Sequence, residues 1–151
     1  MVEVEILGVS DTPSHPVVLL RHKDRVLPIV VGAPEAQAIY VGLRKEKLGR
    51  PMTHDLVCNL LAGLRAELES VTIYKLENDT FFAHLNVKQE SASGEMEQML
   101  RIDSRPSDGI AIAVRRDCPI YVAEEVMDSA SQDAGGVEHE DNGDSDGEDE
   151  F

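Results

Sequence analysis

The chain contains no tryptophan, three phenylalanines, three tyrosines and two cysteines in 151 residues. Cys58 and Cys118 lack the CxxC spacing of a zinc or redox site, so we expect reduced, buried thiols. Apolar runs stay well below the roughly 18 residues needed to cross a bilayer, and Glu3 and Glu5 stand where a signal peptide would carry bases. These absences predict a cytoplasmic protein that does not enter membranes.

Basic residues are also scarce. The chain has 14 Lys and Arg against 29 Asp and Glu, a net charge of −15. Residues 1–127 hold all 14 bases and 19 of the acids, and Arg outnumbers Lys nine to five. This balance is typical of proteins adapted to high internal salt. It counts against tight nucleic-acid binding, which depends on Lys and Arg contacts to phosphate, so a nucleic-acid site would have to be locally basic.

The other 10 acids lie in residues 128–151, which are dominated by Asp, Glu, Gly and Ser. Such a segment buries too little apolar surface to offset the entropy lost on ordering. We therefore expect a domain over residues 1–127 followed by a disordered acidic tail. The tail would either keep the protein soluble at high salt or act as a polyanion that competes for a basic surface.

Apolar residues make up 42% of the chain, enough for the core of one domain. Val2, Val4 and Ile6 alternate with acids, which predicts a half-buried strand. Further strands are predicted over residues 17–20, 26–31, 70–76, 80–87, 96–102 and 119–122, and helices are predicted to begin near Pro34, Thr53 and Pro106. Because strands and helices do not alternate strictly, we expect an α+β domain with a mixed, mainly antiparallel sheet and about three helices.

Two local features refine this arrangement. Pro28 cannot donate a backbone hydrogen bond, so its strand should be interrupted or lie at a sheet edge. Thr53 offers a side-chain oxygen to cap the second helix, which would carry Leu56, Leu60, Leu61 and Leu64 on one face.

The first polar cluster runs from Arg50 to Asp55 at the start of that helix. His54 and Asp55 would lie in the first turn, where they could transfer protons or bind a metal ion. A structural alternative stays open, in which Asp55 complements the helix dipole and His54 packs or hydrogen-bonds.

The second cluster runs from Asp103 to Asp108, where a strand ends and the third helix begins. Carboxylates at such a junction could hold a divalent cation, and Arg105 could bind a phosphate through two hydrogen bonds. The alternative is a capping network in which Arg105 pairs with Asp103.

These segments occur together with others in a recognisable order. The set comprises Leu27–Gly32 with Glu35-Ala36, Arg50–Leu56, Phe82-Ala83, Ile102–Asp108 with Ile110–Ala113, and Pro119–Val122. Over residues 3–127 the chain resembles the bifunctional nuclease domain family, although Gly109 stands where the family motif usually has alanine. The resemblance implies a compact α+β domain with nuclease activity on DNA and RNA.

The resemblance also implies the site. The implied catalytic residues are Glu35, His54, Asp55, Asp103 and Asp108, and the implied substrate-binding residues are Arg50, Thr53, Arg105 and Ser107. His54 would act as general base or acid, Arg50 or Arg105 would stabilise the charged phosphate, and Mg²⁺ or Mn²⁺ would be held by Asp55, Asp103 and Asp108.

The scarcity of aromatic rings predicts little sequence selectivity, because rings supply the platforms on which bases stack. The alternative function is a non-catalytic regulatory or ligand-binding domain that uses the same polar pocket. Sheet edges that need protection favour a homo-oligomer, most simply a dimer.

Overall fold

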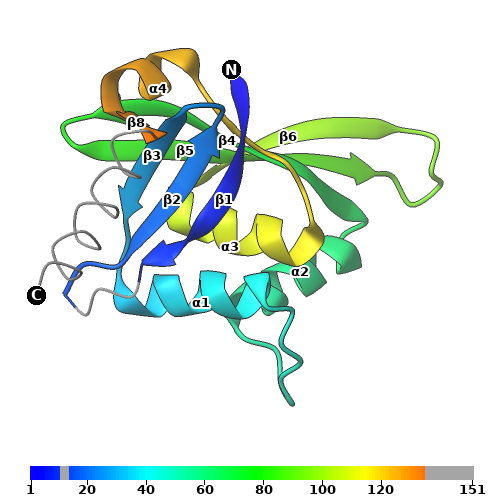
Figure 1. The fold of residues 1–151 in the computed structure, drawn as a ribbon. Coiled ribbons are helices and arrows are strands. Elements are labelled where there is room, and N and C mark those ends of the chain that lie inside the picture. The colour runs from blue at the N-terminus through cyan, green and yellow to red at the C-terminus, as the bar shows by residue number, and fades with distance from the viewer. Residues whose placement is uncertain (11–13, 135–151) are drawn as a thin grey trace, which may run out of the picture.

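The computed structural model describes residues 1–10 and 14–134 (Figure 1). These described residues form eight strands and four helices. The strands are β1 Val2–Ser10, β2 Val17–His22, β3 Arg25–Val30, β4 Ala66–Glu77, β5 Thr80–Glu90, β6 Glu97–Ser104, β7 Ile120–Val122 and β8 Gln132–Asp133. The helices are α1 Ala33–Leu43, α2 Thr53–Gly63, α3 Pro106–Arg116 and α4 Glu124–Ala130.

The strands form one sheet in the order β6-β5-β4-β7-β1-β2-β3-β8. Every neighbouring pair is antiparallel except β4 and β7, which are parallel. The predicted α+β class and mainly antiparallel sheet are confirmed, with α4 as a fourth helix. The eight-residue β6 is the long edge strand, because β8 at the other edge has only two residues.

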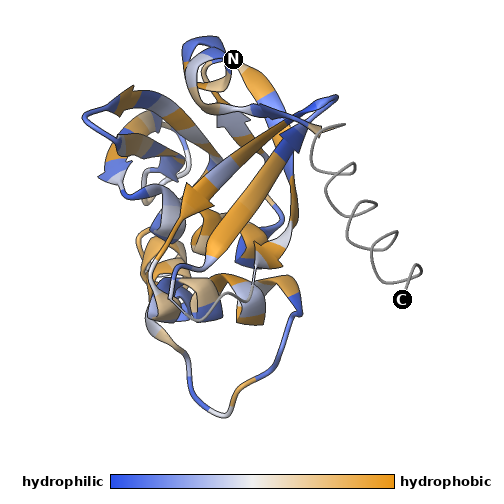
Figure 2. Ribbon diagram, turned by 60° about the vertical axis from the view of Figure 1, so that its left-hand side comes forward, coloured by the Kyte–Doolittle hydropathy of each residue, from blue (hydrophilic) through white to orange (hydrophobic). Residues whose placement is uncertain are grey.

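Alternation along the strands produces the core. Val18 lies opposite Ile29, and Leu20 lies opposite Leu27, and all four side chains are buried. Figure 2 shows how apolar residues follow the strands into the interior. β8 pairs only with the first two residues of β3, so Pro28 lies where β3 is itself an edge strand, as its missing N–H requires.

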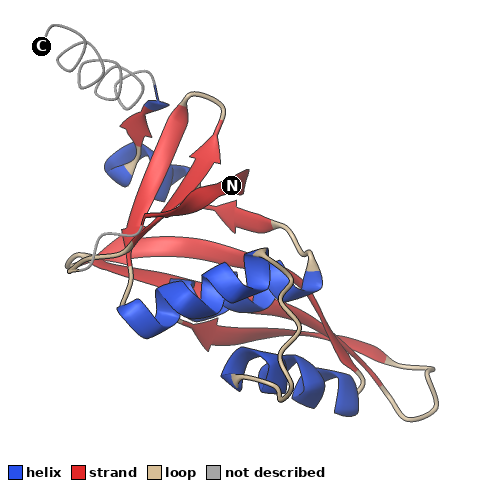
Figure 3. Ribbon diagram, turned by 60° about the horizontal axis from the view of Figure 1, so that its bottom comes forward, coloured by secondary structure: helices blue, strands red, loops and turns tan. Residues whose placement is uncertain are grey.

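Helix α3 packs against the middle of the sheet, and α1 and α2 both contact α3 (Figure 3). Its apolar side includes Ile110 and Ile112, which are buried over the strands. A Cβ on Gly109 would lie 2.8 Å from Val71 Cγ1. Glycine at this position therefore allows α3 to approach β4 closely.

The start and the exposed side of α2 differ from the predictions. Met52, not Thr53, is the N-cap residue, so the predicted Thr53 cap is wrong. The Met52 backbone N–H instead donates to Asp55 Oδ2 at 2.8 Å, and this bond fixes the first turn from the third helical position. Three of the four leucines expected on one apolar face are exposed, and only Leu61 packs against the core.

The folded region also extends further than predicted. Helix α4 continues to Ala130, and β8 adds an antiparallel pairing with β3. Val126 and Met127 are buried, and they anchor α4 to the domain. Residues 128–134 therefore belong to the domain, because α4 and β8 supply the contacts that composition alone does not show. The predicted disorder of residues 135–151 concerns a segment outside the described residues.

Both cysteines are free and partly buried. Burial raises the pKa of the Cys58 and Cys118 thiols, so both stay protonated at neutral pH. Among the described residues, no helix has the length and apolar character required to cross a membrane.

We expect Gly42→Ala to destabilise the protein, because the new Cβ would lie 2.6 Å from Val114 Cγ2 and 2.7 Å from Arg115 Nη1. Overpacking of this kind costs about 1–3 kcal/mol, more than the gain of up to about 1 kcal/mol in helix propensity. Urea unfolding measures the difference. Gly63→Ala is the matched control, since nothing lies within 4 Å of its new Cβ. Equal stability of the two variants would contradict the close approach of α1 and α3.

Candidate active site

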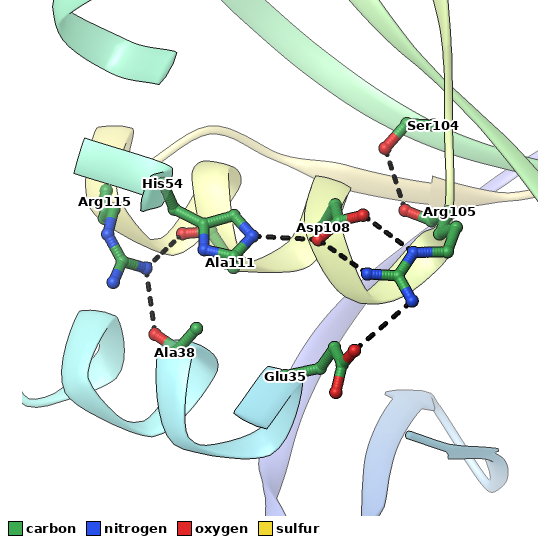
Figure 4. A network of polar contacts seen from close by, with 8 residues as sticks. All are labelled: Glu35, Ala38, His54, Ser104, Arg105, Asp108, Ala111 and Arg115. Carbon is green, nitrogen blue, oxygen red and sulfur yellow. Dashed lines mark hydrogen bonds and ion pairs between the residues drawn. The ribbon is translucent and has the colours of Figure 1, made fainter. Parts of the chain in front are cut away.

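The first turns of α1 and α3 meet at one corner of the domain (Figure 4). Arg105, the N-cap residue of α3, donates from Nε to Asp108 Oδ2 at 2.9 Å and from Nη2 to Asp108 Oδ1 at 3.2 Å. Its Nη1 reaches Glu35 Oε1 of α1 at 3.3 Å. Two carboxylates thus hold one guanidinium whose side chain is 63% exposed.

His54, in the first turn of α2, joins the same network. Its Nε2 lies 2.9 Å from Asp108 Oδ1, and its side chain is 13% exposed. Burial tends to raise the pKa of Asp108, but the hydrogen bonds from Arg105 and His54 outweigh it and hold that pKa below its usual value. An ionised carboxylate only accepts, so Nε2 of His54 donates and Nδ1 is left as the proton acceptor.

Glu35 has one carboxylate oxygen at this corner that can still accept a hydrogen bond. Its Oε2 is buried and has no hydrogen-bond partner among the described residues. That oxygen lies against Gly32, where a Cβ would come within 2.3 Å of it. Backbone N–H groups at helix N-termini favour anions. The corner therefore combines an exposed cation, two helix starts and one carboxylate oxygen that can still accept a bond.

A second, buried network lies beside this corner. Arg115 of α3 is 7% exposed, and its Nε donates to Asp55 Oδ1 at 2.8 Å. Its Nη1 donates to the carbonyls of Ala38 in α1 at 2.9 Å and Ala111 in α3 at 2.7 Å. One guanidinium thus connects α3 to both α1 and α2, and we call this network the Arg115 clamp. It fixes the start of α2, and hence His54.

The clamp also accounts for Asp55. Burial tends to raise the pKa of Asp55, but the bonds from the Met52 N–H and from Arg115 outweigh it and lower that pKa. Both oxygens are engaged, as in the alternative that gives Asp55 a structural role. Arg115 was not among the site residues predicted from the sequence, because 60 residues separate it from Asp55 and no local pattern indicates that it is buried.

The other predicted site residues do not join the corner. Asp103 lies opposite His84, in register with the residues that face away from α3, because its neighbours Ile102 and Ser104 oppose the buried Leu85 and Ala83. The predicted pair of Arg105 with Asp103 is replaced by Arg105 with Asp108. Ser107 is buried, whereas Thr53 and Arg50 are exposed.

The three predicted metal ligands lie in three different places. Asp108 lies at the corner, Asp55 in the Arg115 clamp and Asp103 on the far side of β6. Within the part of the chain that the structure describes, no three His, Cys, Asp or Glu side chains are grouped to hold one ion. Glu35 and Asp108, which share Arg105, are the two carboxylates that come nearest to a common site.

Comparison with known proteins gives this corner a context. Residues 17–135 match the bifunctional nuclease domain. The chain belongs to the bifunctional nuclease domain family. It is also 39% identical over 134 residues to an uncharacterized protein of Mycobacterium tuberculosis, a match that covers 86% of this chain and 76% of the relative.

Plant members of the family are more distant. Bifunctional nuclease 1 of Arabidopsis thaliana is 29% identical over 115 residues, which cover 74% of this chain and 34% of the plant protein. Bifunctional nuclease 1 of Oryza sativa subsp. japonica is 26% identical over 120 residues, which cover 78% of this chain and 35% of the relative. Membership in the bifunctional nuclease domain family supports a nuclease-like role at the level of the family.

We expect Arg115→Met to lower the free energy of unfolding by about 3 kcal/mol, because it leaves the Asp55 carboxylate and two carbonyls without their donor. Arg116→Met is the matched control. Arg116 is exposed, so its replacement should change stability by less than about 0.5 kcal/mol. Denaturant unfolding compares the two variants, and equal losses would contradict the clamp.

Asp108 should make stability depend on acid pH. Because folding lowers the pKa of Asp108, its ionised form contributes stability above the unfolded pKa of about 4, and this contribution is lost as pH falls through the folded pKa. Wild type should therefore exceed Asp108→Asn in stability at pH 7, with the difference shrinking below about pH 4. Thermal unfolding from pH 7 to pH 3 tests this. A difference that does not change with pH would contradict the lowered pKa.

Proposed function

We propose that this bifunctional nuclease domain hydrolyses phosphodiester bonds in DNA and RNA at the corner formed by Glu35, His54, Arg105 and Asp108. The observation that carries the proposal is the hydrogen bond of 2.9 Å between His54 and Asp108, directly beside an exposed guanidinium. A histidine oriented by a carboxylate can transfer protons, and an exposed guanidinium can bind the phosphate.

In this mechanism, Arg105 binds the non-bridging phosphate oxygens of the substrate. His54 Nδ1 takes a proton from the attacking water, whose oxygen forms the new bond to phosphorus. The ester bond to the leaving oxygen breaks, and a proton from the imidazolium neutralises that oxygen. Asp108 holds the imidazole in one tautomer and stabilises its charged form, as in other carboxylate–histidine pairs.

We also propose that Mg²⁺ or Mn²⁺ assists at this corner. The free, buried Oε2 of Glu35 fits a cation ligand, and Asp108 supplies a second carboxylate nearby. A divalent ion bound there would offset the negative charge that develops on the phosphate. Because Arg105 bridges the two carboxylates and is mostly exposed, it can turn from them toward the phosphate.

Among the described residues, the hydrogen-bonded network at the corner contains no Phe or Tyr. It consists of carboxylates, one guanidinium and the imidazole of His54, which is 13% exposed, so a bound base gains little stacking surface there. Contacts to phosphate do not depend on the base. Cleavage by this arrangement should therefore show little sequence selectivity.

The test is hydrolysis of single-stranded DNA, double-stranded DNA and RNA by purified protein with Mg²⁺, Mn²⁺ or EDTA. His54→Ala should lower the rate by about 10²–10⁴-fold, and Arg105→Ala by about 10²–10³-fold. His84→Ala is the matched control, because His84 opposes Asp103 on the far side of β5 and β6. A wild-type hydrolysis rate in His54→Ala would contradict the proposal, as would equal losses of rate in His54→Ala and His84→Ala.

A second candidate function is binding of a small anionic ligand without turnover. The observation that favours it is that the carboxylate of Asp108 already accepts hydrogen bonds from both Arg105 and His54. A site whose polar groups are paired in this way can bind and release a ligand without chemistry. Calorimetry with a dinucleotide then shows binding that depends on Arg105 while the dinucleotide stays intact. Hydrolysis that depends on His54 would exclude this function.

A further inference from the structure

Helix α2 and its C-cap residue Leu64 present a row of leucines that remains exposed among the described residues. Leu56, Leu60 and Leu64 recur at intervals of four residues, and their exposed fractions are 50%, 55% and 61%. No residue of α2 is fully buried. Isolated exposed leucines are common on protein surfaces, but a continuous apolar row usually marks an interaction site.

The row runs beside the free edge strand β6. At one end of α2, His54 bonds Asp108, which lies four residues after the end of β6. At the other end, Leu64 lines a cavity of about 510 Å³ together with Glu97 and Gln98 at the start of β6. Helix α2 therefore runs alongside β6 in the opposite direction, as Figure 3 shows at the edge of the helix layer.

The side of β6 that faces the helices is also apolar. Leu100 and Ile102 lie opposite the buried Val87 and Leu85, so they share the face on which α2 and α3 pack. Ile102 is nevertheless 39% exposed, because β6 lies at the edge of the sheet that the described strands form. We call the leucine row and these two β6 residues the α2–β6 surface.

No described strand pairs with the outer edge of the eight-residue β6, and such an edge carries a row of backbone groups that can accept another strand. The opposite face of β6 indicates which strand fits. The side chains of Arg101 and Asp103 point to that face, near His84, and neither side chain forms a hydrogen bond or ion pair with a described residue. They flank Ile102 symmetrically and carry opposite charges, so the segment is complementary to an antiparallel copy of itself.

We propose that two copies of this chain form a symmetric dimer through β6 and α2, with the two β6 strands antiparallel and Ile102 at the two-fold axis. In this register, Arg101 of each subunit faces Asp103 of the partner subunit, which creates two cross-strand ion pairs. Directly opposed residues in antiparallel strands have Cβ atoms about 5 Å apart, within reach of such pairs.

The apolar faces meet on the other side of the joined strands. The two Ile102 side chains lie together there, and the leucine rows of the two α2 helices close over each other. A specific interface buries roughly 800 Å² on each partner, more than three half-exposed leucines supply. The dimer therefore requires both elements, with backbone pairing along β6 and apolar packing along α2.

Reversing the charge of Arg101 or Asp103 tests whether the partner is a second copy of the chain and whether the two β6 strands pair in this register. Wild type should sediment as a dimer at micromolar concentration and 0.15 M salt. Arg101→Asp places two carboxylates opposite each other, and Asp103→Arg does the same with two guanidinium groups, so each should raise the dimer Kd by at least roughly tenfold. The double variant, with both charges exchanged, restores opposite charges in the same register and should recover the dimer.

Two further variants complete the experiment, which uses analytical ultracentrifugation of the full chain. Leu60→Glu should abolish the dimer while circular dichroism stays unchanged, because Leu60 is exposed in the subunit. Asp24→Arg is the matched control for Asp103→Arg. It makes the same charge change in the exposed turn between β2 and β3, so it should leave the dimer intact.

Three results would overturn the proposal. One is a wild type that stays monomeric at 100-fold higher concentration. Another is a dimer that survives both Leu60→Glu and Asp103→Arg. The third is a double charge exchange that remains as weak as the single variants, because then Arg101 and Asp103 do not face each other.

Discussion

The arrangement of the three helices depends on the buried guanidinium of Arg115. The sheet supplies a surface for α3, but it does not by itself determine how α1 and α2 flank that helix. Arg115 bonds Asp55 of α2 and a carbonyl of α1 from a single side chain. Because a buried charge without partners is costly, displacement of either neighbouring helix is penalised. The positions of Glu35 and His54 follow from this constraint.

The corner itself illustrates how an acidic protein can present a cation. The whole chain carries a net charge of −15, yet Arg105 is held in an exposed position by Glu35 and Asp108. The hydrogen bond to Asp108 raises the pKa of Arg105, so the guanidinium stays charged. Local geometry thus places an exposed guanidinium between two carboxylates, and the charges of the rest of the chain contribute only a screened background.

Much of the fold was predictable because its signals are local. Alternation identified β1, and Pro34 and Pro106 located two helix starts. The sequence also placed Glu35, His54, Arg105 and Asp108 among the candidates, although it could not separate them from Asp103, whose side of β6 depends on the register with β5. The sequence could not predict that Arg105 also pairs with Glu35, that Arg115 is buried or that Leu60 is exposed. Each of these depends on contacts between elements far apart in sequence.

The passage from β6 into α3 leaves almost no chain between sheet and helix. Ser104 is the last residue of the strand and Pro106 the first of the helix, so Arg105 alone connects them. A phosphate-binding residue on a long loop would lose backbone entropy when its ligand arrives. Here the backbone is already fixed on both sides, and only the side chain of Arg105 has freedom left to lose. In the proposed mechanism, an insertion at this junction would therefore weaken phosphate binding through entropy, even if every side chain of the corner remained present.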